Sequence, residues 1–272
     1  MIRSQSPLRE VAKQIRISAL RQAYRTGLGH LGGTFSVVEI LTSLYYLDFI
    51  RDTRDECPVG LRDRLILSKG HACLALYPIL LDLGLIDQDL YDSYGSDGGL
   101  GGQLDISLPG VGWNTGSLGH AVGVGAGIAM GAKIFNFDTR VFAVLGDAEL
   151  AEGSFWEAVA FASDFSLKNL TVIVDRNRLS VTSELGDDAI FREIRTKLKA
   201  FGWHYIDLDG HDFSAIELGL QQALDSSLPT LIMANTIKGK GVGFMQNSAD
   251  WHHGAPSQDD FESAMSWLDA AQ

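Results

Sequence analysis

The chain has 272 residues, of which 46% are hydrophobic and 21% charged, as in an ordinary globular protein. Its net charge of −12 argues against a nucleic-acid partner, because neutralising phosphates requires clustered Lys and Arg. Its two cysteines, Cys57 and Cys73, lack a CxxC spacing, which favours reduced thiols in the cytoplasm. Residues 1–13 lack the apolar core of a signal peptide, and the longest apolar stretch, 121–132, is too short to span a bilayer. We therefore expect a cytoplasmic protein.

The first half of the chain is predicted to be mainly helical. Apolar residues at helical spacing and glycine stops predict the helices, and the run Leu65-Ile66-Leu67 predicts a strand. In chain order the elements are a helix from Ser6 to before Gly27, a helix over 36–49, a strand over 63–68 and a helix over 71–83. Residues 93–116 are rich in glycine and lack periodicity, which predicts a long loop. A loop of that length in a compact domain is usually functional.

The second half alternates between strands and helices. Strands are predicted over 140–145, 170–174, 204–208 and 230–235, and helices over 154–165, 190–201 and 213–224. The strands are continuous runs of Val, Ile and Leu, which is typical of a mostly parallel sheet covered by helices on both faces. We therefore expect an α/β fold, with residues 1–272 as a single domain. Ligands of such sheets bind beyond the carboxyl ends of the strands.

Two of the predicted strands end in polar residues that could share one ion. Asp147 follows the strand over 140–145, and Asn177 follows the next strand, one crossover later. Parallel neighbours would bring both side chains to the same sheet edge, where they and a backbone carbonyl would offer only oxygen ligands. Such a set suits Mg²⁺, which keeps waters and binds phosphate oxygens. Taken separately, Asp147 would cap a helix and Asn177 would form an Asx-turn; together they favour a site for metal and phosphate.

Gly146-Asp147 followed by Asn177 resembles the thiamine diphosphate motif, in which Gly-Asp-Gly is followed by Asn. Other blocks resemble transketolases in particular, and they occur in the family's order over nearly the whole chain. These blocks are residues 29–30, 67–72, 115–120, 152–158, 175–179, 236–241 and 251–254. The resemblance implies the thiamine-diphosphate-binding fold, in its diphosphate-binding form, and the cofactors thiamine diphosphate and Mg²⁺.

The resemblance also implies roles for individual residues. Asp147 and Asn177 would bind Mg²⁺ through their side chains, and Leu179 through its carbonyl. The residues implied around the cofactor are His71, Gly116, Ser117, Leu118, Gly146, Ala148, Asn177, Lys238 and His252. His30, His71 and His252 match the family's active-site histidines, which suits proton transfer to and from sugar hydroxyls. The implied reaction moves a two-carbon ketol unit from a ketose to an aldose through a thiamine diphosphate enamine.

The chain departs from the family's pattern in three places. Ala148 stands where the family commonly has Gly, which adds a methyl group near the diphosphate. Gln103 stands where the loop usually carries a histidine, so this catalytic position has a residue that cannot titrate. After Trp267 the sequence has no counterpart of the pyrimidine-binding domain, whose glutamate activates the cofactor. We therefore expect an N-terminal transketolase subunit that acts with a C-terminal partner, as an α2β2 heterotetramer.

Three other interpretations remain open. An α subunit of a 2-oxoacid dehydrogenase would share the diphosphate motif, although the blocks at 67–72 and 251–254 argue against it. A non-catalytic transketolase paralogue would account for Gln103 and Ala148. A fragment of 1-deoxyxylulose-5-phosphate synthase is a variant within the same class. Outside the implied site, we interpret His120 and His211 as structural, Lys69 as a solvated charge, and Lys240 as a second anion contact or a loop charge.

Overall fold

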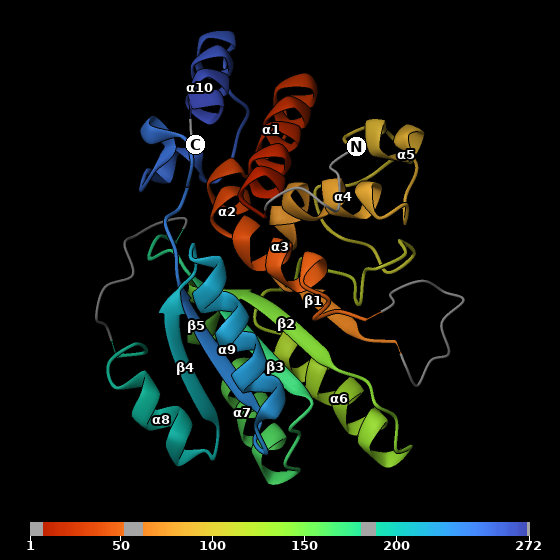
Figure 1. The fold of residues 1–272 in the computed structure, drawn as a ribbon, viewed down its shortest axis with the longest axis vertical. Coiled ribbons are helices and arrows are strands. Elements are labelled where there is room, and N and C mark those ends of the chain that lie inside the picture. The colour runs from red at the N-terminus through yellow and green to blue at the C-terminus, as the bar shows by residue number, and fades with distance from the viewer. Residues whose placement is uncertain (1–7, 52–61, 181–188, 271–272) are drawn as a thin grey trace.

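The computed structural model describes residues 8–51, 62–180 and 189–270. Within them one sheet of five parallel strands runs through the molecule, in the order β1-β2-β3-β5-β4 (Figure 1). The strands are β1 (Arg64–Leu67), β2 (Val141–Gly146), β3 (Leu170–Arg176), β4 (His204–Asp209) and β5 (Thr230–Asn235). The predicted α/β class and the parallel sheet are confirmed, and each predicted strand lies within two residues of its expected bounds.

Helices cover both faces of the sheet. They are α1 (Leu8–Thr26), α2 (Leu31–Ser36), α3 (Val38–Tyr46), α4 (Cys73–Asp82), α5 (Gln88–Asp92), α6 (Ala121–Ile134), α7 (Gly153–Asp164), α8 (Ile194–Ala200), α9 (Phe213–Asp225) and α10 (Gln258–Ala270). Alternate side chains of a strand enter different cores, because successive residues point to opposite faces. Phe142 and Val144 pack with α1, α3, α4 and α9, whereas Val141, Ala143 and Leu145 pack with α6, α7 and α8.

The helices differ from the expected ones in several places. The expected helix over 36–49 is preceded by the separate helix α2, whose two glycines, Gly32 and Gly33, weaken a helical pattern. The expected helix over 190–201 is wrong at its start, because Glu193 adopts a left-handed conformation and α8 begins after it. Helices α5 and α10 were not predicted. Ser6, Pro7 and Cys57 lie outside the described residues.

The long loop lies over the carboxyl edge of the sheet. It is confirmed, because no helix or strand occurs between α5 and α6. The order in which strands are added to the sheet also reverses: β4 follows β3 in sequence but pairs with the far side of β5. Such a reversal of strand order leaves a crevice in which ligands of α/β proteins bind. In the part of the chain that the structure describes, no helix is both long and apolar enough to cross a membrane.

Candidate active site at the carboxyl edge of the sheet

A cavity of about 340 Å³ opens beyond the carboxyl ends of β1, β2 and β3. Nearly all the residues that the sequence assigned to the site line it. They are His30, His71, Gln103, Leu118, Gly146, Asp147, Ala148, Asn177, Leu179, Lys238 and His252. Gly116 and Ser117 belong to the neighbouring loop but do not line the cavity. The parallel topology therefore brings together residues from segments far apart in the sequence.

Asp147 and Asn177 meet at one edge of the sheet, as predicted. β2 and β3 are parallel neighbours, with Gly146 opposite Asp175, so the residues that follow the two strands lie side by side. The Asp147 carboxylate is only 2% exposed and accepts a hydrogen bond from the backbone N–H of Arg178 at 2.6 Å. Burial raises the pKa of this carboxyl, and nearby Asp175 raises it further, against that N–H and the charge of Arg176. A further cation would therefore be favourable beside it.

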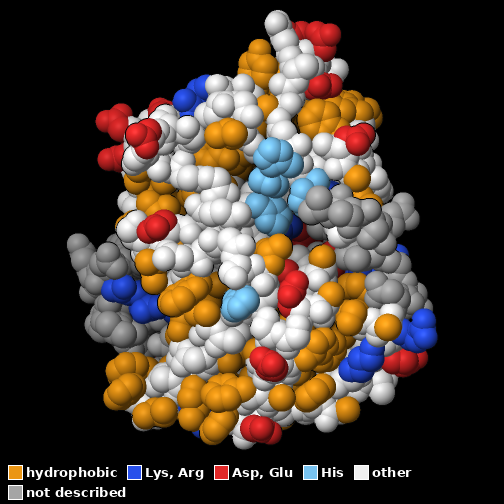
Figure 2. Space-filling model, turned by 180° about the vertical axis from the view of Figure 1, so that it is seen from behind, with side chains coloured by type: hydrophobic (Ala, Val, Ile, Leu, Met, Phe, Trp, Pro, Cys, Tyr) orange, Lys and Arg blue, Asp and Glu red, His pale blue; other side chains and the backbone are white. Residues whose placement is uncertain are grey.

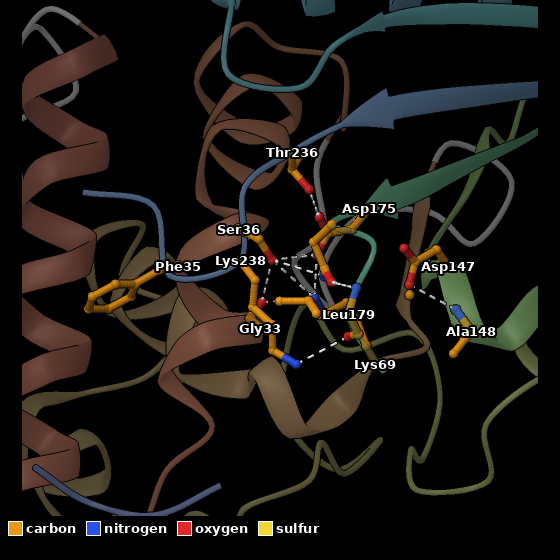
Figure 3. A network of polar contacts seen from close by, with 12 residues as sticks. Gly33, Phe35, Ser36, Lys69, Asp147, Ala148, Asp175, Leu179, Thr236 and Lys238 are labelled. Carbon is orange, nitrogen blue, oxygen red and sulfur yellow. Dashed lines mark hydrogen bonds and ion pairs between the residues drawn. The ribbon is translucent and has the colours of Figure 1, made fainter. Parts of the chain in front are cut away.

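A buried ion pair joins Lys69, which also lines the cavity, to Asp175 (Figure 3). Lys69 is 2% exposed, so its interpretation as a solvated charge is wrong. Its ammonium also donates to the carbonyl of Gly33 at 2.8 Å, and Asp175 accepts from the hydroxyls of Ser36 and Thr236. Burial pushes the pKa of Asp175 upward, but the Lys69 charge and these hydrogen bonds outweigh it and lower the pKa. The pair fixes the ends of β1, β3 and β5 relative to one another.

This ion pair also orients the amide of Asn177. The amide nitrogen of Asn177 donates to Asp175 Oδ2 at 3.2 Å, and carboxylates only accept. The amide oxygen must then point the other way, where it accepts from the N–H of Leu179 at 3.2 Å. The sequence motif at 175–179 gives no sign of this role, but in the structure Asp175 determines which end of the Asn177 amide is available in the cavity.

Glu149 is a third buried carboxylate at this site, beside Asp147 and Asp175, and the sequence analysis missed it. Its Oε1 accepts from the N–H of Gly146 at 2.9 Å, and its Oε2 accepts from the N–H of Gly119 at 2.8 Å and from the Ser68 hydroxyl. Both oxygens are acceptors, so an amide could not replace the carboxylate without turning a donor toward an N–H. Glu149 thereby joins the ends of β1 and β2 to the loop that carries Leu118.

The cavity offers an all-oxygen donor set and a cation. The oxygens belong to the Asp147 carboxylate, the Asn177 amide and the Leu179 carbonyl, a set of the kind that Mg²⁺ prefers. The ammonium of Lys238 donates to the Leu179 carbonyl at 3.1 Å. Burial, and then the charge of Lys69, lowers the pKa of Lys238 to about 8, so its ammonium is still mostly charged at pH 7. A buried ammonium beside oxygen ligands is suited to a phosphate group.

Three histidines form a cluster at the mouth of the cavity, and histidine side chains adjoin one another on the face shown in Figure 2. The ring centroids of His30 and His71 are 5.1 Å apart, and those of His71 and His252 are 5.6 Å apart. Burial, followed by neighbouring positive groups, lowers the pKa of His30 and of His252 to about 4 and that of His71 to about 2. All three rings are therefore neutral at pH 7, and each has one nitrogen that accepts a hydrogen bond and one that donates.

His252, rather than the adjacent His253, lines the cavity. Its Nδ1 lies 2.9 Å from the Lys238 ammonium. Because an ammonium only donates, His252 accepts at Nδ1 and carries its proton on Nε2. The exposed ring of His253 packs at the outer side of His30, with ring centroids 4.7 Å apart.

Gln103 lies in the long loop and reaches the cavity beside Thr115 and Gly70. The Thr115 hydroxyl donates to Gln103 Oε1 at 3.1 Å. A Cβ on Gly70 would lie 1.8 Å from the Thr115 hydroxyl oxygen, so glycine is needed for this close approach. Gln103 itself lines the cavity, and its amide nitrogen is an uncharged donor.

His120 and His211, which we interpret as structural, lie outside the cluster, and the hydrogen bonding of their rings differs. His211 is fully engaged: its Nδ1 donates to Glu39 at 3.0 Å and its Nε2 accepts from the N–H of Ile237 at 2.8 Å. His120 is exposed, and its Nδ1 lies 3.1 Å from the carbonyl of Leu118. Neither histidine lines the cavity.

These features define a class of protein: an α/β domain that binds a phosphate-bearing cofactor at the carboxyl edge of a parallel sheet. The family model described as the transketolase thiamine diphosphate binding domain matches residues 8–267. The chain therefore belongs to the transketolase family and carries its thiamine diphosphate binding domain. This membership distinguishes it from an α subunit of a 2-oxoacid dehydrogenase.

Individual relatives agree with this assignment. The chain is 37% identical over 245 residues to a protein of Phocaeicola vulgatus named as one subunit of an apulose-4-phosphate transketolase, covering 89% of this chain and 86% of that protein. It is 32% identical to the 6-deoxy-6-sulfo-D-fructose transketolase subunit SqwG of a Clostridium species, and the match covers 99% of this chain and 98% of that protein. The crystal structure of transketolase from Campylobacter jejuni superposes with a TM-score of 0.88 at 28% identity. The match covers 96% of this chain and 42% of the Campylobacter jejuni chain.

Proposed function

We propose that this chain is the cofactor-binding subunit of a two-chain transketolase, which transfers a two-carbon ketol unit from an anionic ketose to an aldose. The observation that carries the proposal is a single cavity that holds both the Asp147–Asn177 oxygen set and three neutral histidines. The chain also matches proteins named as subunits over nearly their whole length, at 86% and 98%, which supports residues 1–272 as one domain.

The oxygen set supports a resident Mg²⁺ held by the side chains of Asp147 and Asn177 and the carbonyl of Leu179. Lys238, Asn177 and the backbone at Ala148 would contact the diphosphate, which is close to the metal in such sites. Leu118 and the backbone of Gly116 and Ser117 would lie along the cofactor. When bound, thiamine diphosphate supplies the carbon nucleophile and the electron sink for cleaving a ketose.

The histidines would handle the protons of the sugar. His30, His71 and His252 are neutral at pH 7, so His30 and His71 can each hydrogen-bond a hydroxyl as donor or acceptor, and His252 can do so as a donor. The contact with Lys238 fixes the orientation of His252, with Nε2–H left to face a substrate. Gln103 would contribute a hydrogen bond to the substrate without taking part in proton transfer.

A second chain would complete the enzyme. The names of both relatives describe them as subunits, and the solved transketolases are more than twice as long as the part that this chain matches. We infer that a partner carries the pyrimidine-binding domain and its glutamate, in an α2β2 assembly in the cytoplasm. The two relatives are named for sugars that carry a phosphate or a sulfo group. A ketose with such an anionic group is therefore the donor class to test first.

We expect no ketol transfer by this chain alone and turnover when the partner is added. The physical reason is that this cavity would hold the cofactor's diphosphate end, whereas the glutamate that activates its ring would come from the partner. A coupled assay with ketose phosphates measures this for the chain, the partner and an equimolar mixture. Sustained turnover by this chain alone would contradict the two-chain proposal, and an inactive mixture that still binds thiamine diphosphate would contradict the substrate class.

Replacing Gln103 with His should change the choice of donor more than stability. The new ring could titrate where the present amide only donates, and it would sit beside Thr115 at the cavity. The kcat/KM values for several ketose donors should change in rank, with individual ratios shifting on the order of tenfold for one altered hydrogen bond. Ser107→Ala, in the same loop but outside the cavity, serves as control. An unchanged ranking would mean that Gln103 does not contact the substrate.

A further inference from the structure

A second cavity, of about 560 Å³, lies between α1, α10 and the turn that follows β5. It shares no lining residue with the candidate active site. Arg9, Lys13 and Arg16 form one wall, and their spacing of four and three residues places them on one face of α1. Lys240 approaches from the turn after β5. Four basic side chains thus surround one cavity in a chain whose net charge is −12.

Three acidic residues also line this cavity, against four basic ones, and one of the three is paired with Arg16. Glu39 forms a paired contact with Arg16, at 2.8 and 2.7 Å, and also accepts from His211. Glu10 accepts from the side chain of Gln14 at 2.8 Å. Asp269 is the remaining acid, and its backbone carbonyl accepts from Lys13 at 3.2 Å.

Two of the cations are not neutralised. Arg9 and Lys240 make no ion pair or side-chain hydrogen bond to any residue that the structure describes, although both line the cavity. They approach it from different elements, Arg9 from α1 and Lys240 from the turn after β5. Their charges are therefore available to an anion held between them.

The buried guanidinium of Arg16 also has an unused donor. Its Nε–H has no partner among the described residues, although Arg16 is only 5% exposed. The turn passes close to this side chain: a Cβ on Gly241 would lie 3.1 Å from Arg16 Cδ and 3.4 Å from Nε, and the φ of +100° at this position suits glycine. A buried donor without an acceptor is costly, so this side of the cavity lacks a hydrogen-bond acceptor.

The cavity is connected to the candidate active site through the same turn. The N–H of Lys240 donates to the carbonyl of Ile237 at 3.1 Å, and the N–H of Ile237 donates to His211 at 2.8 Å. Lys238, which lines the active site, lies between Ile237 and Lys240 in the chain. A ligand that draws Lys240 inward therefore acts on a turn that also determines the position of Lys238.

We propose that this second cavity binds a small phosphate-bearing anion through Arg9, Lys13, Lys240 and the Nε–H of Arg16, and that its occupancy alters cofactor affinity at the neighbouring active site. Phosphate supplies several acceptor oxygens and a double negative charge, which matches two unpaired cations and a spare guanidinium donor. Coupling between two such sites is reciprocal, so cofactor binding must change phosphate affinity by the same factor. The proposal does not depend on which sugars the enzyme uses.

The test is a calorimetric titration of inorganic phosphate into the full chain, loaded with thiamine diphosphate and Mg²⁺ so that the active site is filled. We expect saturable binding that weakens tenfold or more in the double variant Arg9→Gln/Lys240→Gln. Lys199→Gln, an exposed lysine of α8 that does not line the cavity, should bind phosphate as the wild type does. Equal phosphate affinity in the double variant, or no saturable binding by the wild type, would overturn the proposed site.

A second titration tests the coupling. Thiamine diphosphate affinity is measured with and without saturating phosphate, in the wild type and in the double variant. We expect phosphate to shift cofactor affinity by about fivefold or more in the wild type, the lower end of usual coupling energies, and much less in the double variant. The same shift in both proteins would show that phosphate acts by competing in the active site instead.

Discussion

Replacing Asp147 with Ala is expected to abolish Mg²⁺-dependent binding of thiamine diphosphate while leaving the fold intact. Asp147 supplies the one carboxylate of the proposed metal ligands, and it is almost fully buried at the end of β2. Losing an outer-shell partner of a metal ligand costs about 10–100-fold in affinity, so loss of a ligand should cost at least that much. The fold should persist at a lower thermal midpoint, because Arg176 loses its buried ion-pair partner but still packs its guanidinium over the Phe191 ring.

Calorimetric titration of thiamine diphosphate in the presence of Mg²⁺ measures the loss, and the thermal midpoint reports on the fold. Asp147→Asn keeps the shape and one oxygen, so it should fall between the wild type and the Ala variant. Asp164→Ala removes an exposed carboxylate at the end of α7 and should have no effect. Cofactor affinity like that of the wild type in Asp147→Ala would contradict the metal assignment.

Replacing Lys69 with Met should destabilise the protein strongly. The change leaves the carboxylate of Asp175 buried without its counter-charge, although Ser36, Thr236 and Asn177 still donate to it. Breaking a buried ion pair by removing one partner costs about 3–5 kcal/mol. For a protein of this size, such a loss lowers the thermal midpoint on the order of 10 °C.

The matched control is Lys199→Met, which makes the same chemical change at an exposed position of α8. The double variant Lys69→Met/Asp175→Asn should recover part of the stability, because it removes the uncompensated charge. It should still bind cofactor poorly, since the neutral amide at position 175 no longer dictates the orientation of Asn177. A thermal midpoint for Lys69→Met within about 2 °C of the wild type, roughly 1 kcal/mol or less, would contradict the structural role of the pair.

The sheet could be predicted from the sequence because its strands are continuous apolar runs. Those runs required no knowledge of distant contacts, and β5 was predicted with its observed bounds. The sequence also predicts that Asp147 and Asn177 lie close together, because adjacent parallel strands end at one edge of the sheet. Helix α2 could not be predicted, because its sequence Leu-Gly-Gly-Thr-Phe-Ser has low helix propensity. Every residue in it is buried, so tertiary packing stabilises this helix.

The partners of the buried charges could not be predicted. Lys69 carries no local sign that it pairs with Asp175, which is 106 positions away, and an isolated lysine is usually exposed. Glu149 follows Asp147 so closely that the sequence alone does not distinguish it from any other polar residue of the same turn, although its three donors come from three separate segments. Their roles depend on the topology that brings those segments together, which spacing along the chain does not encode.

The most direct test of the account is a crystal structure of this chain with its partner, thiamine diphosphate and Mn²⁺ in place of Mg²⁺. We predict an anomalous peak at about 2.0–2.2 Å from the side-chain oxygens of Asp147 and Asn177 and from the Leu179 carbonyl, allowing for the slightly larger ion. The diphosphate should lie against Ala148 and Lys238, with the thiazolium ring toward His71 and His252. An anomalous peak elsewhere, or a cofactor bound outside this cavity, would contradict the account.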